Sequence, residues 1–139
     1  MRDIKLPLRE TYFSKLTALD LDVYENGAVP SGSTTPYIII SSVDVREESN
    51  KSDFGHKAAI LLDIVTKFPK NQTGGGKERD LIAGQILAVI NSKAPFIINE
   101  NLQSVNLKIT SDQTLEGTAD TDRVFRRLIR FEHTIRQLN

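Results

Sequence analysis

The sequence PYIIISSVDV at residues 36–45 decides the fold together with HKAAILLDIVTK at residues 56–67. The first stretch is rich in the β-branched and aromatic residues that strands favour, and Pro36 stands at its start. In the second stretch, even-numbered residues from Ala58 to Thr66 would line one face and odd-numbered residues from Lys57 to Lys67 the other. Both patterns predict long strands, which we expect to be antiparallel neighbours at the centre of a sheet.

Two amphipathic helices are predicted to flank these strands in the sequence. Pro7 suits a first helical turn, and after it apolar residues recur at steps of four, four and three, as Leu8, Tyr12, Leu16 and Leu19. The second helix should span residues 77–92, with Glu78 and Asp80 in its first turn, where the helix dipole favours acidic side chains. Its wide apolar face is typical of a helix that packs on a sheet.

The rest of the chain predicts shorter strands and one ambiguous segment. Residues 21–24 and 105–109 alternate as strands, whereas the polar residues 111–122 predict a loop or hairpin end. Residues 123–138 fit a helical seam and also fit strand alternation; their β-branched and aromatic content favours a strand. We therefore predict an α+β fold, a single domain over residues 1–139, with a mainly antiparallel sheet of long strands packed against two amphipathic helices.

Composition excludes several classes of protein. The 139 residues carry 18 Lys and Arg against 18 Asp and Glu, so no net charge draws the chain to nucleic acid or to an anionic membrane. The absence of cysteine excludes disulfides and thiolate sites and suits a reducing compartment. No apolar run approaches the length of a membrane helix, and the first residues do not resemble a signal peptide. These features predict a soluble cytosolic protein with no membrane contact.

The sequence contains no recognisable catalytic, cofactor-binding or metal-binding motif. A P-loop ending at Lys77 would need glycine at position 71 and serine or threonine after the lysine, but Asn71 and Glu78 stand there. The acidic residues of 44–53 and 112–122 lack the order of a calcium loop. His56 and His133 are expected to be half-exposed strand residues. We predict no enzyme and no cofactor.

One charge asymmetry lies at the C-terminus, which holds five arginines, namely Arg123, Arg126, Arg127, Arg130 and Arg136. If this segment is a strand, Arg126, Arg130 and Arg136 share one face. That face could be solvated, or it could meet the carboxylates of another subunit or DNA phosphates, since arginine binds both.

The order of these features resembles the tail-terminator or tail-completion family of long-tailed bacteriophages. The resemblance is carried by the helix at residues 8–19, Val29-Pro30, the stretch beginning Pro36-Tyr37, the strand at 56–66, and the glycines before the helix at 80–90. It implies a structural virion protein that forms a hexameric ring, caps the tail tube, ends its polymerisation and docks the head-neck connector. Double-stranded DNA would pass through the lumen without sequence readout. Assembly would occur in the host cytoplasm, and the final place would be the tail-neck junction.

A ring protein should use loops and charged segments as interfaces. We expect residues 46–53 and 69–77 to reach a neighbouring subunit or ring, and the C-terminal arginines to line a subunit interface or the lumen. The candidate interface residues are Arg46, Glu47, Glu48, Lys51, Lys70, Gly74, Gly75, Gly76, Lys77, Arg123, Arg126, Arg127, Arg130 and Arg136.

Two alternatives remain open from the sequence. Another neck or head-completion ring protein would have a similar composition. A small anion-binding or nucleotide-binding enzyme would use the loop Gly74–Lys77, whose backbone N–H groups precede a helix.

Overall fold

A computed structural model gives the fold, and it describes residues 3–48, 55–70, 76–91, 95–119 and 121–138. In chain order the elements are α1 (Lys5–Thr17), β1 (Asp22–Glu25), β2 (Tyr37–Glu47), β3 (Gly55–Pro69), α2 (Gly76–Ile90), β4 (Phe96–Asn99), β5 (Leu102–Ala119) and β6 (Asp122–Gln137). Within the described residues, no helix is long and apolar enough to cross a membrane.

The strands form one six-stranded sheet in the order β1-β2-β3-β6-β5-β4. β1 runs parallel to β2, while the other neighbouring strands in this order are antiparallel. The sheet is therefore mixed, which corrects the prediction of a mainly antiparallel sheet. The physical reason lies in residues 26–36, which separate β1 from β2 and are long enough to return the chain to the end at which β1 began.

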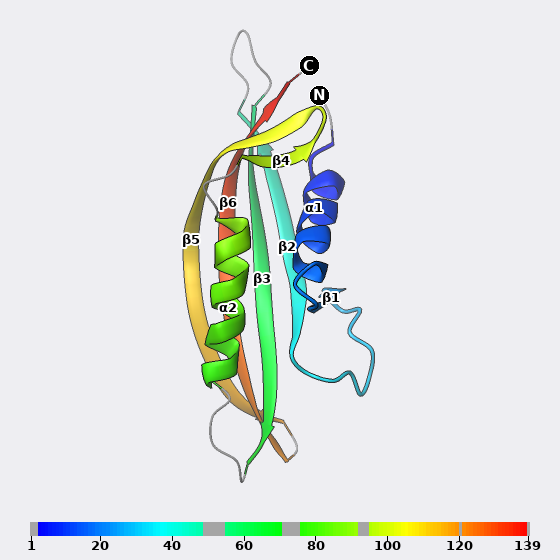
Figure 1. Ribbon diagram of the computed structural model, residues 1–139, viewed down its shortest axis with the longest axis vertical. Coiled ribbons are helices and arrows are strands. Elements are labelled where there is room, and N and C mark those ends of the chain that lie inside the picture. Colours follow the sequence, from blue (N-terminus) through cyan, green and yellow to red (C-terminus); the bar gives the residue numbers. More distant parts are fainter. Residues whose placement is uncertain (1–2, 49–54, 71–75, 92–94, 120, 139) are drawn as a thin grey trace.

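Both helices lie on the same face of the sheet, so the molecule has two layers (Figure 1). α1 packs against β1, β2 and β4, and α2 packs against β3 and β6. The core between the layers is built from the faces that the sequence indicates, and one cluster contains Leu8, Tyr12 and Leu16 of α1 together with the even-numbered residues 58–64 of β3. Full burial of one such apolar side chain stabilises the fold by about 2 kcal/mol relative to its exposure.

Most predicted elements are confirmed, with shifted ends. The segment at residues 123–138 is a strand, and β2 and β3 pair antiparallel. α1 begins before Pro7, because the carboxylate of Asp3 accepts hydrogen bonds from the N–H groups of Lys5 and Leu6. Of the two alternatives predicted for residues 111–122, the loop is wrong and the hairpin end is confirmed, because β5 continues to Ala119 and pairs with β6 along its whole length. The sequence patterns do not indicate the short strand β4.

The closed end of the β2–β3 hairpin leaves no room for a side chain at Gly55. Its carbonyl oxygen accepts a hydrogen bond from the N–H of Glu48 at 2.7 Å, and a Cβ at Gly55 would lie 2.8 Å from the carbonyl oxygen of Glu48. We expect Gly55→Ala to lower the free energy of unfolding by about 2 kcal/mol, because backbone rather than a flexible side chain must move. Chemical denaturation measures the effect.

Gly84 offers the matched control. It is exposed within α2, and a Cβ there would meet nothing within 4 Å. Gly84→Ala should raise the free energy of unfolding by about 1 kcal/mol through helix propensity. Equal effects of the two substitutions would contradict the close backbone contact at Gly55.

Candidate interaction surfaces

The sheet face opposite the helices is the first candidate surface, and we call it the open face. The register assigns to it the odd-numbered residues of β3 and the even-numbered residues of β6. Basic side chains outnumber acidic ones there, with Arg46, Lys57, Lys67, Lys108, Arg126, Arg130 and Arg136 against Asp22, Asp44, Asp63, Asp122 and Glu132. A chain without net charge thus carries an excess of positive charge on one of its faces.

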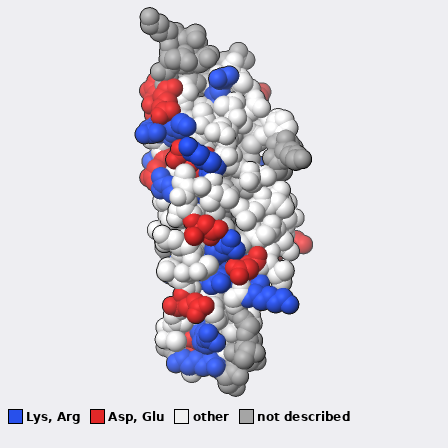
Figure 2. Space-filling view, turned by 90° about the vertical axis from the view of Figure 1, so that its left-hand side faces the viewer, with Lys and Arg blue, Asp and Glu red and all other residues white. Residues whose placement is uncertain are grey.

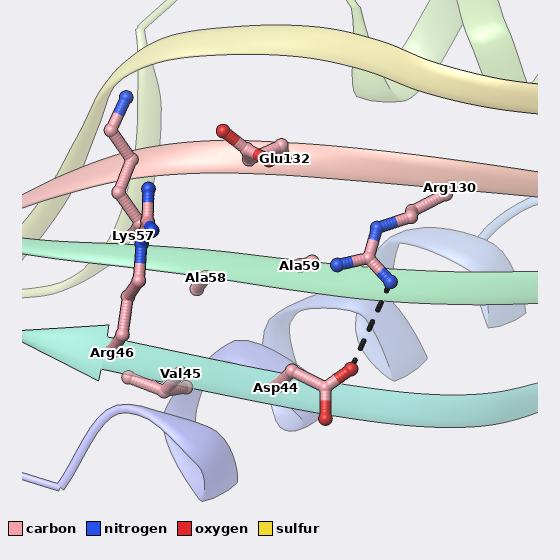
Figure 3. A pocket seen from close by; sticks show the side chains of 8 residues that line it. All are labelled: Asp44, Val45, Arg46, Lys57, Ala58, Ala59, Arg130 and Glu132. Carbon is pink, nitrogen blue, oxygen red and sulfur yellow. Dashed lines mark ion pairs between the residues drawn. The ribbon is translucent and has the colours of Figure 1, made fainter.

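A shallow hollow crosses the open face where β2, β3 and β6 run side by side (Figure 3). Arg46 and Lys57 line one end of it, and Arg130 and Asp44 line the other. Arg130 Nη1 lies 3.9 Å from Asp44 Oδ2, and the two side chains are 40% and 66% exposed. Water screens such a pair, so it contributes little to stability and leaves Arg130 available to a partner.

Arg126 is paired with a carboxylate of its own chain. Its Nε donates to Oδ1 of Asp63 at 3.2 Å, and Nη2 donates to Oδ2 of the same carboxylate. The side chain of Asp63 is only 3% exposed, whereas that of Arg126 is 43% exposed. The hydrogen bond to Asp63 raises the pKa of Arg126. The pair joins the two central strands β3 and β6, and it satisfies a buried charge.

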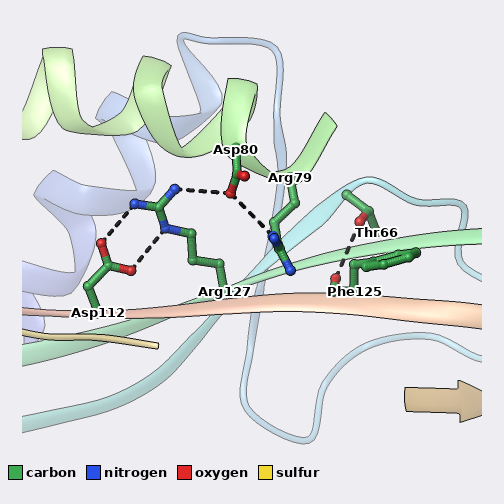
Figure 4. Close-up of polar contacts among 6 residues, drawn as sticks. All are labelled: Thr66, Arg79, Asp80, Asp112, Phe125 and Arg127. Atoms are coloured by element: carbon green, nitrogen blue, oxygen red, sulfur yellow. Dashed lines mark hydrogen bonds and ion pairs between the residues drawn. The ribbon is translucent and has the colours of Figure 1, made fainter. Parts of the chain in front are cut away.

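Arg127 lies on the other face of β6, under α2 (Figure 4). Its Nε and Nη2 donate to the two oxygens of Asp112 at 2.9 and 2.8 Å, and its Nη1 donates to Asp80 Oδ1 at 3.1 Å. The hydrogen bond from Arg127 is the main cause that lowers the pKa of Asp112. Arg127 therefore ties α2 and β5 to β6, and it does not share the face of Arg126 and Arg130.

Arg79 is a buried cation that the sequence analysis missed. Its Nε lies 3.3 Å from Asp80 Oδ1, and its guanidinium lies 5.9 Å from the centre of the Phe125 ring (Figure 4). The spacing holds the signal, because Arg79 precedes Ile82 by three residues and Ile86 by seven, on the buried stripe of α2. Residue type alone would place an arginine on the solvated face of this helix.

The remaining C-terminal arginines differ in their surroundings. The guanidinium of Arg123 lies 4.8 Å from the centre of the Phe125 ring, an arrangement that favours a cation. Arg136 is exposed near the end of β6, beside Gly55 in the sheet. Of the five arginines, Arg130 and Arg136 are thus the two on the open face that a partner can reach with least cost to the fold.

The described parts of the two predicted interface loops lie at opposite ends of the long strands. At one end, Arg46 and Glu47 belong to β2, and Arg46 Nη2 lies 3.1 Å from Glu48 Oε1. At the other end, the N–H of Lys70 donates to the carbonyl of Thr121 at 3.1 Å, while Gly76 and Lys77 begin α2. The predicted residues Lys51, Gly74 and Gly75 lie outside the described residues.

Charges of both signs follow the side of the molecule on which β5 lies in Figure 1. Figure 2 views this side and shows Lys and Arg interleaved with Asp and Glu along the long axis. Such a surface does not present a single sign of charge to DNA; it suits pairing with another surface of mixed charge.

The two histidines are buried, so the expectation that they are half-exposed is wrong. His133 lies in the core, where its Nδ1 is 2.8 Å from Ser104 Oγ and its Nε2 is 2.5 Å from the Tyr12 hydroxyl. Since the Ser104 hydroxyl donates to the carbonyl of Asn106, it accepts from Nδ1–H, and Nε2 accepts from Tyr12. Burial lowers the pKa of His133 to about 4 and raises the pKa of Tyr12.

This network resembles a hydroxyl–imidazole relay, but its position assigns it a structural role. Tyr12 and His133 have no exposed surface, and Ser104 is buried between strands. A nucleophile must reach its substrate, and these groups instead satisfy one another across α1, β5 and β6. The network therefore fixes how α1 sits on the sheet.

The fold and surfaces define a class: a two-layer α+β protein whose described part offers an uncovered sheet face and unpaired strand edges. The family model described as Tail completion protein gp17 matches residues 14–136. Because the match takes in most of the chain, the protein belongs to this family of structural proteins of phage tails. The family named from the sequence is confirmed.

One of the solved structures similar to this fold is titled "Virion of native gene transfer agent (GTA) particle". The two chains share 15% identity with a TM-score of 0.61, over 88% of this chain and 91% of the other. At this identity the likeness shows the fold alone. No curated protein matches the chain.

Proposed function

We propose that the protein forms a hexameric ring that caps the tail tube, ends its polymerisation and joins the tail to the head-neck connector. Membership of the tail completion family carries this proposal. In it, residues 1–139 act as one domain, the ring sits at the tail-neck junction of the virion, and assembly occurs in the host cytoplasm.

The surfaces support a protein that works through contacts with copies of itself and with other virion proteins. The open face carries an excess of cations, of which Arg130 has only a weak partner. Acidic side chains are exposed around the opposite edge strand β1: Glu10 lies in α1, Asp20 lies between α1 and β1, and Glu25 ends β1. Two patches of opposite charge on one subunit suit a head-to-tail ring, in which each copy uses two different surfaces.

DNA would traverse the lumen without base readout. Arginine and lysine bind DNA phosphates whatever the base sequence, and the release of counterions strengthens this binding. Many such contacts in the lumen would slow the passage of DNA. For this reason we assign Arg130 and Arg136 to contacts between subunits, and we assign the loops at residues 46–53 and 69–77 to contacts with a neighbouring subunit or ring.

Electron microscopy of the purified protein, alone and mixed with growing tail tubes, tests the proposal. We expect rings of six subunits, found at one end of the tubes, and tubes that stop lengthening when the protein is added. A protein that stays monomeric and never joins tubes would contradict the proposal. Rings that bind head connectors but not tubes would identify a different neck protein.

A further inference from the structure

β5 presents a long edge that no described strand covers. β4 pairs only with Leu102, Gln103 and Ser104, so the backbone of residues 105–119 has β6 on one side and no described strand on the other. Figure 1 shows this part of β5 running along the outside of the sheet. Unpaired N–H and C=O groups over such a length form a ready template for another strand.

The other edge of the same sheet is β1, and a groove lies beside it. The outer side of β1 has no neighbour among the described strands. The groove lies between α1 and β1 and is lined by Leu6, Phe13, Val23 and Tyr24 among others, and we call it the α1–β1 groove. It is mostly apolar, and it borders backbone groups that lack a sheet partner.

Exposed apolar side chains collect at these two edges. Among the described residues, Leu6 and Phe13 are exposed at the α1–β1 groove, and Val105, Ile109 and Leu115 are exposed on β5. The other large apolar residues that are exposed are Leu81, Ile97 and Leu138. Apolar side chains on an open edge are a liability for a monomer, and pairing removes them from water.

The strand directions make the two edges compatible. β1 and β2 run the same way, β3 runs opposite, β6 returns and β5 runs opposite again, so β5 is antiparallel to β1 within one subunit. If the ring axis runs along the strands, rotation about it leaves the strand directions the same in every copy. β5 of one copy would therefore meet β1 of the next in antiparallel orientation. Successive pairings also place Asp22 and Leu115 in one row across the open face, through Tyr37, Val65 and Arg126.

We propose that the exposed edge of β5 in one copy pairs with β1 in the next copy and that Ile109, which lies on the same side of the sheet as the helices, enters the α1–β1 groove. This inference rests on the proposed ring and names its interface. A two-fold contact between two β5 edges would close a dimer and leave both β1 edges unpaired. The head-to-tail contact uses both edges of each copy, and ring closure leaves neither unpaired.

Disulfide cross-linking tests the pairing directly, because the chain has no cysteine of its own. Asp22→Cys is combined in turn with Gln113→Cys, Leu115→Cys and Gly117→Cys, which all lie on the open face. A disulfide needs Cα atoms about 4.4–6.8 Å apart, so three positions two residues apart sample the register. We expect one double variant to give covalent multimers up to the ring size under mild oxidation, and we expect the single variants to remain uncross-linked.

Edge variants give a second readout. Leu115→Glu should reduce the fraction of assembled protein by about tenfold or more, because the new carboxylate would face Asp22 of the next copy in the expected register. The melting temperature of the unassembled subunit should stay unchanged, because the side chain of Leu115 is 48% exposed there. Leu138→Glu is the matched control, since Leu138 is 45% exposed and lies on neither edge, and it should assemble as the original protein does.

The outcomes separate the interface from the function. Rings that form without any cross-link from β1 to β5, and that tolerate Leu115→Glu, would overturn the pairing and leave the ring intact. A covalent dimer from Leu115→Cys alone would indicate the two-fold contact and overturn the pairing. A protein that forms no ring, alone or on tail tubes, would remove the proposed function and this inference with it.

Discussion

Replacement of Arg126 by alanine is expected to lower the free energy of unfolding by about 3 kcal/mol, because it leaves the carboxylate of Asp63 buried without its partner. This loss is at the lower end of the range for broken buried ion pairs, because the side chain of Arg126 is 43% exposed and water screens part of its interaction with Asp63. Urea denaturation monitored by circular dichroism measures it.

Arg130→Ala is the matched control on the same strand and face. Its ion pair with Asp44 spans 3.9 Å between exposed side chains, so the change should cost less than about 1 kcal/mol. Adding Asp63→Asn to Arg126→Ala should recover part of the lost stability, since a neutral amide is less costly to bury than a charge. Equal losses from Arg126→Ala and Arg130→Ala would show that Asp63 does not depend on Arg126.

The same pair shows where sequence-based prediction ends. Alternation in residues 56–67 assigns Asp63 to the open face, opposite the core face that holds Leu62, and alternation in the last segment groups Arg126, Arg130 and Arg136 on one face. Which arginine meets which carboxylate depends on the register between β3 and β6, and no local pattern specifies it. The sequence predicts a cluster of arginines on this face, and the structure shows that a buried charge holds one of them.

The strand conformation of residues 112–118 escapes prediction for a different reason. These residues are exposed on both sides of the strand, so no apolar alternation marks them. They become a strand because their backbone pairs with β6, which follows after the turn near Thr121. Polar side chains do not oppose this backbone pairing. A hydrophobic pattern identifies a strand only where one face is buried, and here neither face is.

The burial of His133 is predictable in principle. His133 stands two residues after Phe131 and two before Ile135, so strand alternation places it on the core face. The pattern does not give its partners, since Tyr12 and Ser104 come from other elements far along the chain. Residue type alone favours exposure, and position in the alternation outweighs it.

Acidification is expected to destabilise the protein through His133. Burial lowers the pKa of His133 in the folded state to about 4, against 6.5 for the free side chain. Between these values the unfolded chain binds a proton that the folded chain does not, so the contribution of His133 to stability is fully present above pH 6.5 and is lost as the pH falls toward 4. At about 1.4 kcal/mol for each pKa unit, the loss reaches about 3 kcal/mol.

His133→Gln separates this contribution from that of other titrating groups, since glutamine stays neutral over the whole range and retains hydrogen-bonding atoms. The variant should be less stable at about pH 7, because it disturbs the contacts with Tyr12 and Ser104. Between about pH 7 and pH 4 its free energy of unfolding should fall by about 3 kcal/mol less than that of the original protein. Parallel stability curves for the two proteins would mean that His133 takes up its proton in the folded core as readily as in water, and the sealed network of Tyr12, His133 and Ser104 would then have to open to solvent.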